Sequence, residues 1–116
     1  MKLDKDLTGW KVFPGKMAEY SVTDKGELQV KNGPGMLEYT AAEYGDFVLS
    51  FEVMTKAPHL NSGVFFRQIP GEFTQGYECQ IQNQIKDGDP TQPFDCGTGG
   101  FYRRSNARFV NGKDLE

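Results

Sequence analysis

The residues best suited to chemistry are concentrated in one stretch, His59 to Asn83, which reads HLNSGVFFRQIPGEFTQGYECQIQN. The stretch predicts two β-strands joined by a turn that contains Gly and Pro. It also contains polar side chains that a purely structural hairpin would not need: Asn61, Arg67, Glu78, Gln80 and Asn83. We therefore expect a binding or catalytic surface in this part of the chain.

Glu78 is the first candidate for a general base or a metal ligand. In a strand over Tyr77–Gln82, alternation places Glu78, Gln80 and Gln82 on one face. A carboxylate accepts protons, and the amide of Gln80 can hold the hydroxyl groups of a ligand. Three polar side chains in register predict water or a ligand on that face. An ordinary solvated face with an exposed glutamate is the alternative.

Arg67 is the second catalytic candidate. On a predicted strand over Val64–Ile69, alternation places Arg67 between Phe65 and Ile69, so we expect partial burial and a carboxylate partner. A guanidinium in that position can stabilise a developing negative charge. A structural ion pair with a glutamate explains the same pattern.

His59 is the only histidine, and it follows Ala57-Pro58 in a predicted loop. Imidazole suits a general base and a metal ligand equally. A divalent metal held by His59, Glu78 and another oxygen donor is one hypothesis, although no ligand spacing in the chain demands a metal. An exposed histidine without a role is the alternative.

Asn61, Asn83 and Tyr102 are candidates for substrate binding, together with Gln80. The two asparagines stand at predicted strand ends, where turn formation competes with ligand contact. Tyr102 belongs to a basic and aromatic cluster at the end of the chain, which can bind sugars or phosphates or can protect a solvated edge strand. The remaining members of that cluster are Arg103, Arg104 and Arg108.

Composition excludes several classes of protein. The net charge is -3 and the isoelectric point is about 5.2, which argues against a dedicated nucleic-acid binder. No run of about 18 apolar residues is present, so no membrane span is predicted. The chain opens with polar sequence and shows no leader, as a mature exported protein also would.

Cys79 and Cys96 are the two cysteines. Without a C-x-x-C pair they make a poor zinc site. One disulfide and two free thiols are both compatible with the sequence, so the redox compartment stays open.

Val, Phe and Tyr recur between turn residues, and this pattern predicts an all-β sandwich in a single domain over residues 1–116. The longest predicted strand is Asp46–Thr55, in which apolar residues alternate. From Lys86 to Gly100 the chain is rich in turn residues and predicts a long loop, of a length that is often functional. The other predicted strands are Trp10–Phe13, Glu19–Thr23, Glu27–Val30, Met36–Tyr39 and one that starts at Gly100–Arg104.

An ordered set of motifs resembles the 3-keto-disaccharide hydrolase domain family. The motifs are LDKDLTGWKV, YGDFVLSFEV, NSGVFFR, GYECQIQN and DPTQPFDCGTGGFYRR, and they run from about Leu3 to Arg108. The resemblance implies an antiparallel jelly-roll sandwich of the concanavalin A-like lectin/glucanase type, a carbohydrate ligand and export by bacteria. Family domains are longer, so we expect this chain to be partial, with a sandwich left incomplete or completed by a second copy in a homo-oligomer.

The resemblance also implies a reaction. A keto group at C3 of a sugar acidifies the C2–H bond, so a base can remove that proton and the glycosidic oxygen can leave from C1. The sequence around Glu78 is E-C-Q-I-Q and lacks the E-x-D-x-E pattern of related glucanases, which argues against a double-carboxylate glycosidase. Two alternatives stand beside this enzyme: a non-catalytic carbohydrate-binding module, and an interaction domain that another chain completes.

Overall fold

The computed structural model describes residues 1–107, which form eight short strands and no helix. Every pairing between strands is antiparallel, and each sheet contains two strands. The predicted all-β class is therefore confirmed, whereas the jelly roll stays a prediction. The chain divides into two compact units, Met1–Ser50 and Phe51–Glu116. No helix in the described part is long and apolar enough to cross a membrane.

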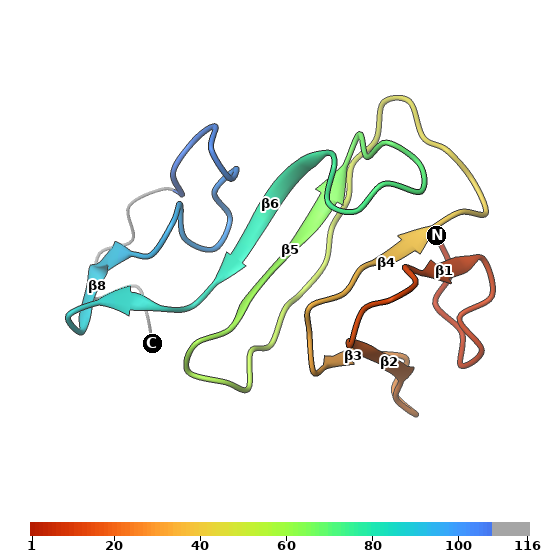
Figure 1. Ribbon diagram of the computed structural model, residues 1–116, viewed down its shortest axis with the longest axis horizontal. Coiled ribbons are helices and arrows are strands. Elements are labelled where there is room, and N and C mark those ends of the chain that lie inside the picture. Colours follow the sequence, from red (N-terminus) through yellow and green to blue (C-terminus); the bar gives the residue numbers. More distant parts are fainter. Residues whose placement is uncertain (108–116) are drawn as a thin grey trace. The chain divides into compact units, whose positions relative to one another are not determined.

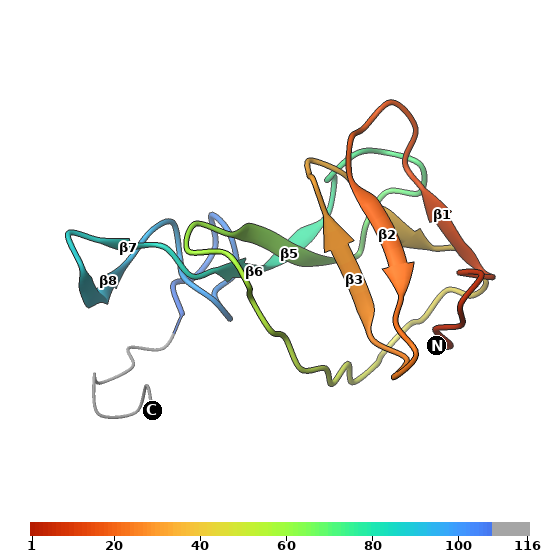
Figure 2. The same ribbon diagram turned by 90° about the horizontal axis from the view of Figure 1, so that it is seen from below.

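The first unit contains two small sheets. Strand β1 (Trp10–Val12) pairs with β4 (Leu37–Tyr39), and β2 (Glu19–Val22) pairs with β3 (Leu28–Lys31), as Figure 2 shows for the hairpin. The β2–β3 turn forms where Asp24-Lys25-Gly26 predicts it, because Gly26 adopts a positive φ of 78° that costs a glycine little.

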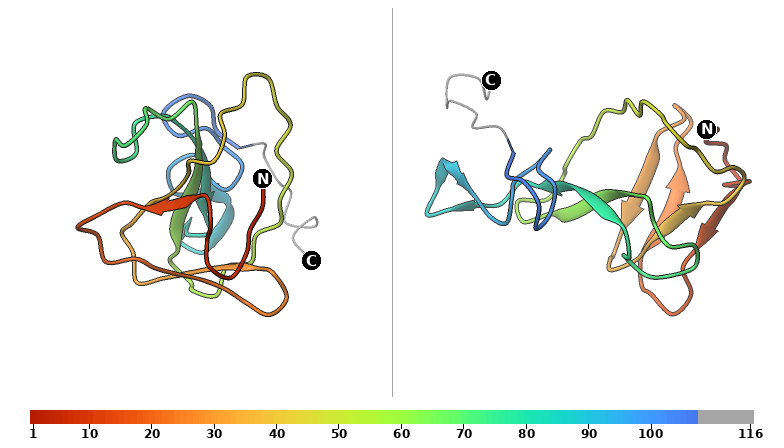
Figure 3. Two further views of the ribbon diagram at one scale, coloured as in Figure 1. Left: turned by 90° about the vertical axis from the view of Figure 1, so that its right-hand side faces the viewer. Right: turned by 90° about the horizontal axis from the view of Figure 1, so that it is seen from above.

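The second unit is built on a hairpin of β5 (Asn61–Phe66) and β6 (Tyr77–Gln82) (Figures 1 and 3). The predicted pair of strands is thus confirmed, with different bounds for the first. Strand β5 ends at Phe66 because Arg67 has a φ of 52°, in the left-handed region, which takes its backbone out of the ladder.

A loop over residues 95–106, called the 95–106 loop below, closes against the free edge of β6. The backbone N–H of Gln80 donates to the carbonyl of Gly100 at 2.8 Å, and the Gln80 carbonyl accepts from Gly99 at 2.9 Å. The N–H of Tyr102 donates to the carbonyl of Glu78 at 3.1 Å. The predicted strand at Gly100–Arg104 is wrong, because Phe101 forms only two isolated bridges, to Cys79 and to Ser105, and no ladder.

Strands β7 (Ile85–Lys86) and β8 (Asp89–Pro93) form a second hairpin in the segment predicted as a loop. Asp87 and Gly88 connect them with φ values of 52° and 74°. An Asp-Gly pair with positive φ at both positions is a favoured two-residue hairpin turn. The loop prediction from Lys86 is therefore wrong for this hairpin.

The predicted strand over Asp46–Thr55 is also wrong, since none of these residues joins a ladder in the described part of the chain. The predicted alternation nevertheless persists in the exposure of the side chains. Phe47 is 45% exposed and Leu49 is 43% exposed, whereas Val48 between them is 97% exposed. The alternation of apolar residues predicts which side chains are less exposed to solvent, but a β-strand also needs a hydrogen-bonded partner strand.

Thr98 offers a test of how the 95–106 loop is held. Its hydroxyl accepts from the N–H of Gln82 at 3.0 Å and donates to the Gln82 carbonyl at 3.1 Å. Because Gln82 is buried, Thr98→Val leaves both groups without a partner and should lower the free energy of unfolding by about 1–3 kcal/mol. Chemical denaturation measures the loss. Thr8→Val, at an exposed position, is the matched control, and equal effects of the two variants would contradict this account of the loop.

Candidate active site

Glu78 lies on β6 and is half-buried above a glycine of the neighbouring strand. Gly63 on β5 pairs with Gln80, so Glu78 is its diagonal neighbour across the ladder. A Cβ atom at Gly63 would lie only 2.6 Å from Cγ of Glu78 and 2.9 Å from Cδ. The carboxylate therefore occupies the space that any other residue at position 63 would fill.

Gln80 is the most deeply buried side chain of the site, with 2% of its surface exposed. Its amide lies between the carboxylates of Glu78 and Asp95. With the oxygen and nitrogen assigned so that both have suitable partners, Nε2 donates to the carbonyl of Ser62 at 2.9 Å and to Oε1 of Glu78 at 3.0 Å. Oδ2 of Asp95 lies 3.3 Å from the other end of the amide.

The predicted polar face of β6 is real, but it is covered rather than open. Gln80 and Gln82 are both buried, and Gln82 is 6% exposed. The expectation that all three polar side chains face water or a ligand is therefore wrong for the two glutamines. The 95–106 loop covers this edge, and its partners satisfy the buried amide and backbone groups.

Asp95 is a site residue that the sequence did not single out. It follows β8 on the 95–106 loop, is exposed, and has a φ of 49°. Its carboxylate reaches Gln80 across 15 positions of sequence. The only advance indication was its place inside a segment predicted to be functional by its length and its turn residues.

The electrostatics of the site make Glu78 a stronger base than an ordinary glutamate. Burial raises the pKa of Glu78, and the negative charge of Asp95 raises this pKa further. Both effects disfavour the ionised form. A carboxylate of this kind takes up a proton more readily, as a general base must.

Both cysteines are free thiols in the structure, and Cys96 is buried with 4% exposure. Burial raises the pKa of the Cys96 thiol. A hydrogen bond from its own backbone lowers this pKa, and the negative charges of Asp95, Glu78 and Cys79 raise it, so the net shift is upward. Because the thiolate is the reactive form, Cys96 is a poor nucleophile here.

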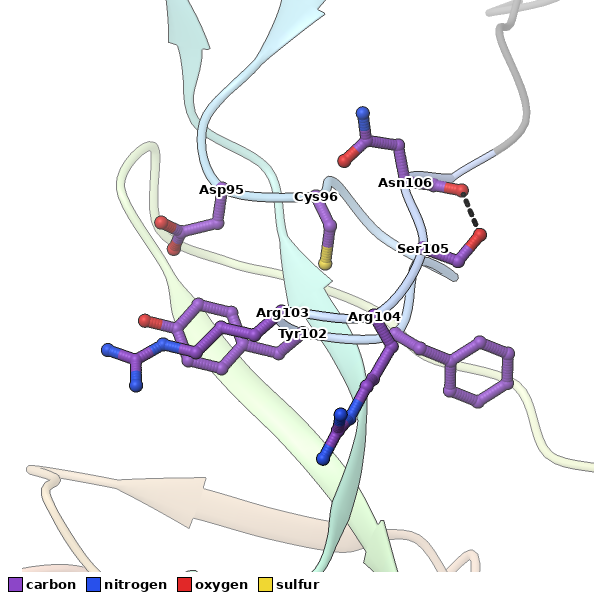
Figure 4. Close-up of a pocket in the computed structure, with 8 residues that line it drawn as sticks. Asp95, Cys96, Tyr102, Arg103, Arg104, Ser105 and Asn106 are labelled. Carbon is purple, nitrogen blue, oxygen red and sulfur yellow. Dashed lines mark hydrogen bonds between the residues drawn. The ribbon is translucent and has the colours of Figure 1, made fainter.

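The 95–106 loop also lines an open hollow of about 420 Å³, a volume in the range of small-ligand sites (Figure 4). Asp95 lines it and Glu78 does not. Tyr102 also lines it, with the guanidinium of Arg103 5.2 Å from the centre of its ring, whereas Arg104 lies 5.6 Å from the ring of Tyr77. The hollow therefore joins an aromatic and cationic wall to the exposed carboxylate.

Arg67 differs from its prediction in burial. The sequence predicts a partly buried side chain, but Arg67 is exposed directly after β5. The prediction of partial burial is wrong for the reason given above, since the positive φ breaks the alternation that placed Arg67 beside Phe65.

The remaining predicted residues gather at the other end of the hairpin. The side chain of Asn83 accepts from the N–H of Leu60 at 2.9 Å and donates to the carbonyl of Ala57 at 2.6 Å. Asn83 therefore anchors the loop that carries His59, which is exposed. Asn61 is exposed at the start of β5. Arg108 lies outside the described residues.

No cluster of ionisable side chains supports the hypothesis of a metal at His59 and Glu78 in the described part of the chain. Among residues 1–107, no three side chains of His, Cys, Asp or Glu lie close enough together to hold a metal ion. His59 has no hydrogen bond or salt bridge to Glu78 in this part of the chain. We therefore derive no step that involves a metal.

Residues 3–114 match the family described as 3-keto-alpha-glucoside-1,2-lyase-like domain. The chain belongs to this family. The match covers nearly the whole sequence and confirms the resemblance carried by the motifs. It supports a role in carbohydrate chemistry. Comparison with curated proteins and with solved structures gave no match.

The raised pKa of Glu78 gives a prediction for stability. Because the folded state binds this proton more tightly than the unfolded state, Glu78 makes the protein less stable as the pH rises through its unfolded and then its folded pKa. Glu78→Gln should therefore raise the free energy of unfolding at about pH 8 by a few tenths to about 1 kcal/mol. The gain should vanish at about pH 3, well below the ordinary pKa of a glutamate, where the carboxyl is protonated in both states.

Denaturation curves of the two proteins at both pH values measure this difference. Glu72→Gln makes the same charge change at an exposed position and should show no comparable dependence on pH. A Glu78→Gln variant that is less stable than the native chain at pH 8 would contradict the prediction.

Proposed function

We propose that this protein is a carbohydrate-active enzyme that cleaves 3-keto-glycosides, with Glu78 as the base that removes the proton from C2. One observation carries the proposal: a half-buried carboxylate of raised pKa is held above Gly63 and beside a buried amide. Membership of the 3-keto-alpha-glucoside-1,2-lyase-like family supports the same substrate class. A raised pKa suits a carboxylate that must accept a proton near neutral pH.

The chemistry proceeds in two stages. Glu78 takes the proton from C2, and the electron pair of the C2–H bond moves onto the C3 carbonyl oxygen as an enolate. The pair then returns to form a double bond between C1 and C2, the bond from C1 to the glycosidic oxygen breaks, and that oxygen takes a proton, which protonated Glu78 can return. Addition of water to the double bond completes net hydrolysis.

The other predicted residues take the following proposed roles. Arg67, an exposed cation directly after β5, stabilises the enolate oxygen, as an oxyanion needs. Tyr102 binds the sugar from the wall of the hollow, and Asn61 contacts it from the start of β5. His59 supplies an acid or a base from its loop. Gln80 and Asn83 act through the groups they hold, Glu78 and the loop of His59.

Export from the cytoplasm and assembly into a homo-oligomer remain proposals that rest on the family resemblance.

Glu78→Gln should abolish turnover of a 3-keto-glucoside while the sugar still binds. Glutamine keeps the shape of the side chain and its acceptor oxygen, but it cannot take up the proton, and loss of a general base costs about 10²–10⁴-fold in rate. Turnover is followed by release of the aglycone, and binding by calorimetry. Glu72→Gln is the control and should keep full activity. If the native protein binds unoxidised glycans and turns over no 3-keto-glucoside, the protein is a binding module and the enzyme proposal is wrong.

Gly63→Ala should lower kcat without unfolding the protein. The new Cβ would meet the flexible end of the Glu78 side chain, and Gly63 has no positive φ that alanine would strain. The carboxylate must therefore move, and a displacement of about 1 Å from the reacting atom can cost about 10²-fold in rate. Gly45→Ala adds the same methyl group into open space and should leave kcat unchanged. Equal activity of the two variants would show that the position of Glu78 does not matter.

A further inference from the structure

The hollow of the 95–106 loop carries two cations, Arg103 and Arg104. Among residues 1–107 neither of them pairs with a carboxylate, although Asp95 lines the same hollow. A guanidinium carries five N–H donors and no acceptor, and without a carboxylate partner in the protein these donors are open to a ligand. The two arginines therefore call for an acceptor from outside the described chain.

A tight turn of the loop fixes where these arginines lie. The N–H of Arg104 donates to the carbonyl of Phe101 at 2.9 Å, and this hydrogen bond closes the turn. The N–H of Tyr102 donates to the carbonyl of Glu78 at 3.1 Å, which ties the turn to β6. Arg103 lies within the turn and has a φ of 58°. The position of its side chain is thus set relative to the strand that carries the proposed base.

The two guanidinium groups contact different rings. The guanidinium of Arg103 lies 5.2 Å from the centre of the Tyr102 ring, and that of Arg104 lies 5.6 Å from the centre of the Tyr77 ring. Tyr102 lines the hollow and Tyr77 does not, and Figure 4 shows the two arginine side chains extending in different directions. A cation–π contact holds the face of a guanidinium and leaves its N–H edges open. Arg103 is therefore the cation best placed for a ligand in the hollow.

The charges around the hollow limit which anion it suits. Its lining contains two arginines and one aspartate, which sum to +1, whereas the whole chain carries -3. A positive hollow in an acidic chain favours an anionic ligand, and the charge of Asp95 repels a group with two negative charges more strongly than a group with one. A carboxylate also accepts hydrogen bonds from hydroxyl groups. A sugar with a single carboxylate meets both conditions.

We propose that this hollow is a subsite for an acidic sugar, in which Arg103 binds the carboxylate of a uronic acid unit and Asp95 accepts hydrogen bonds from its hydroxyl groups. The inference rests on the function proposed above, and it makes the substrate a 3-keto-glycoside that contains a uronic acid. Oδ2 of Asp95 lies 3.3 Å from the Gln80 amide, which donates to Glu78 at 3.0 Å. The acidic sugar therefore occupies the position next to the sugar on which Glu78 acts.

Glucuronic acid and glucose test this preference, because they differ only at C6, where a carboxylate replaces a hydroxymethyl group. The native protein should bind glucuronic acid about 10- to 100-fold more tightly than glucose, as a charge-assisted hydrogen bond to a guanidinium provides. The preference should shrink at high salt, which screens an exposed ion pair. Calorimetry at low and high salt measures both effects.

Arg103→Gln should abolish the preference and leave the affinity for glucose nearly unchanged. Arg103→Lys keeps the charge but not the planar fork, so it should retain part of the preference. Lys86→Gln is the matched control, because Lys86 is an exposed cation 6.0 Å from the ring of Phe94 and does not line the hollow. This variant should keep the native preference. Arg103 is also exposed, so these variants should fold, which denaturation curves check.

Asp95→Ala separates recognition of a sugar from attraction of any anion. Acetate carries a carboxylate without hydroxyl groups, so removal of the Asp95 charge should strengthen acetate binding. Loss of the acceptor should weaken binding of glucose. The ratio of the affinity for glucuronic acid to that for acetate should therefore fall by about 10-fold. An unchanged ratio would overturn the role of Asp95.

The outcomes distinguish this proposal from the one it rests on, because the binding measurements need no turnover. If glucuronic acid binds no more tightly than glucose, or if Arg103→Gln keeps the preference, the acidic subsite is overturned. Tighter binding of glucose 6-phosphate than of glucuronic acid, lost in Arg103→Gln, would assign the hollow to a phosphate instead. A native protein that prefers glucuronic acid but cleaves no 3-keto-glucoside would support the subsite and overturn the proposed function.

Discussion

The pairing of Gln80 with the 95–106 loop is the interaction on which the rest of the site depends. Its backbone N–H and carbonyl bind Gly100 and Gly99, so the loop has a fixed position along β6. The same residue turns its side chain toward both carboxylates. The backbone of Gln80 thereby fixes where Asp95 lies along β6 relative to Glu78. Without this pairing nothing would hold Asp95 beside the side chain of Gln80, because the two residues are far apart in sequence.

Local chemistry in the sequence was sufficient to predict the strands that carry Glu78 and its neighbours. Aromatic and β-branched residues between Gly and Pro turns indicate β5 and β6, and Gly26 marks the turn between β2 and β3. The Asp87-Gly88 turn carried an equally local signal, which a composition rich in turn residues obscured. The end of β5 could not be read in this way, because nothing in the residue type of Arg67 requires a positive φ.

Contacts between segments far apart in the sequence explain the features of the site that the sequence did not predict. Alternation places Glu78, Gln80 and Gln82 on one face but does not say whether that face meets water or another segment. The cover comes from residues 95–106. Its backbone depends on Gly97 and Gly99, which adopt positive φ values of 70° and 86°, and on Gly100, where a Cβ atom would lie 2.8 Å from Cβ of Cys96. Asp95 becomes a site residue only through this contact. The absent ladder at residues 46–55 has a similar origin, since periodicity cannot supply a partner strand.

The two carboxylates of the site differ in environment. Asp95 is exposed and lines the hollow. Glu78 is half-buried beneath Gln80 and near a negative charge, and both conditions raise its affinity for a proton. A pair of identical carboxylates in identical surroundings would compete for the same proton. Unequal burial separates these two, which supports the proposal that Glu78 is the base. The asymmetry follows from geometry alone: one residue lies within a ladder and the other on the loop that covers it.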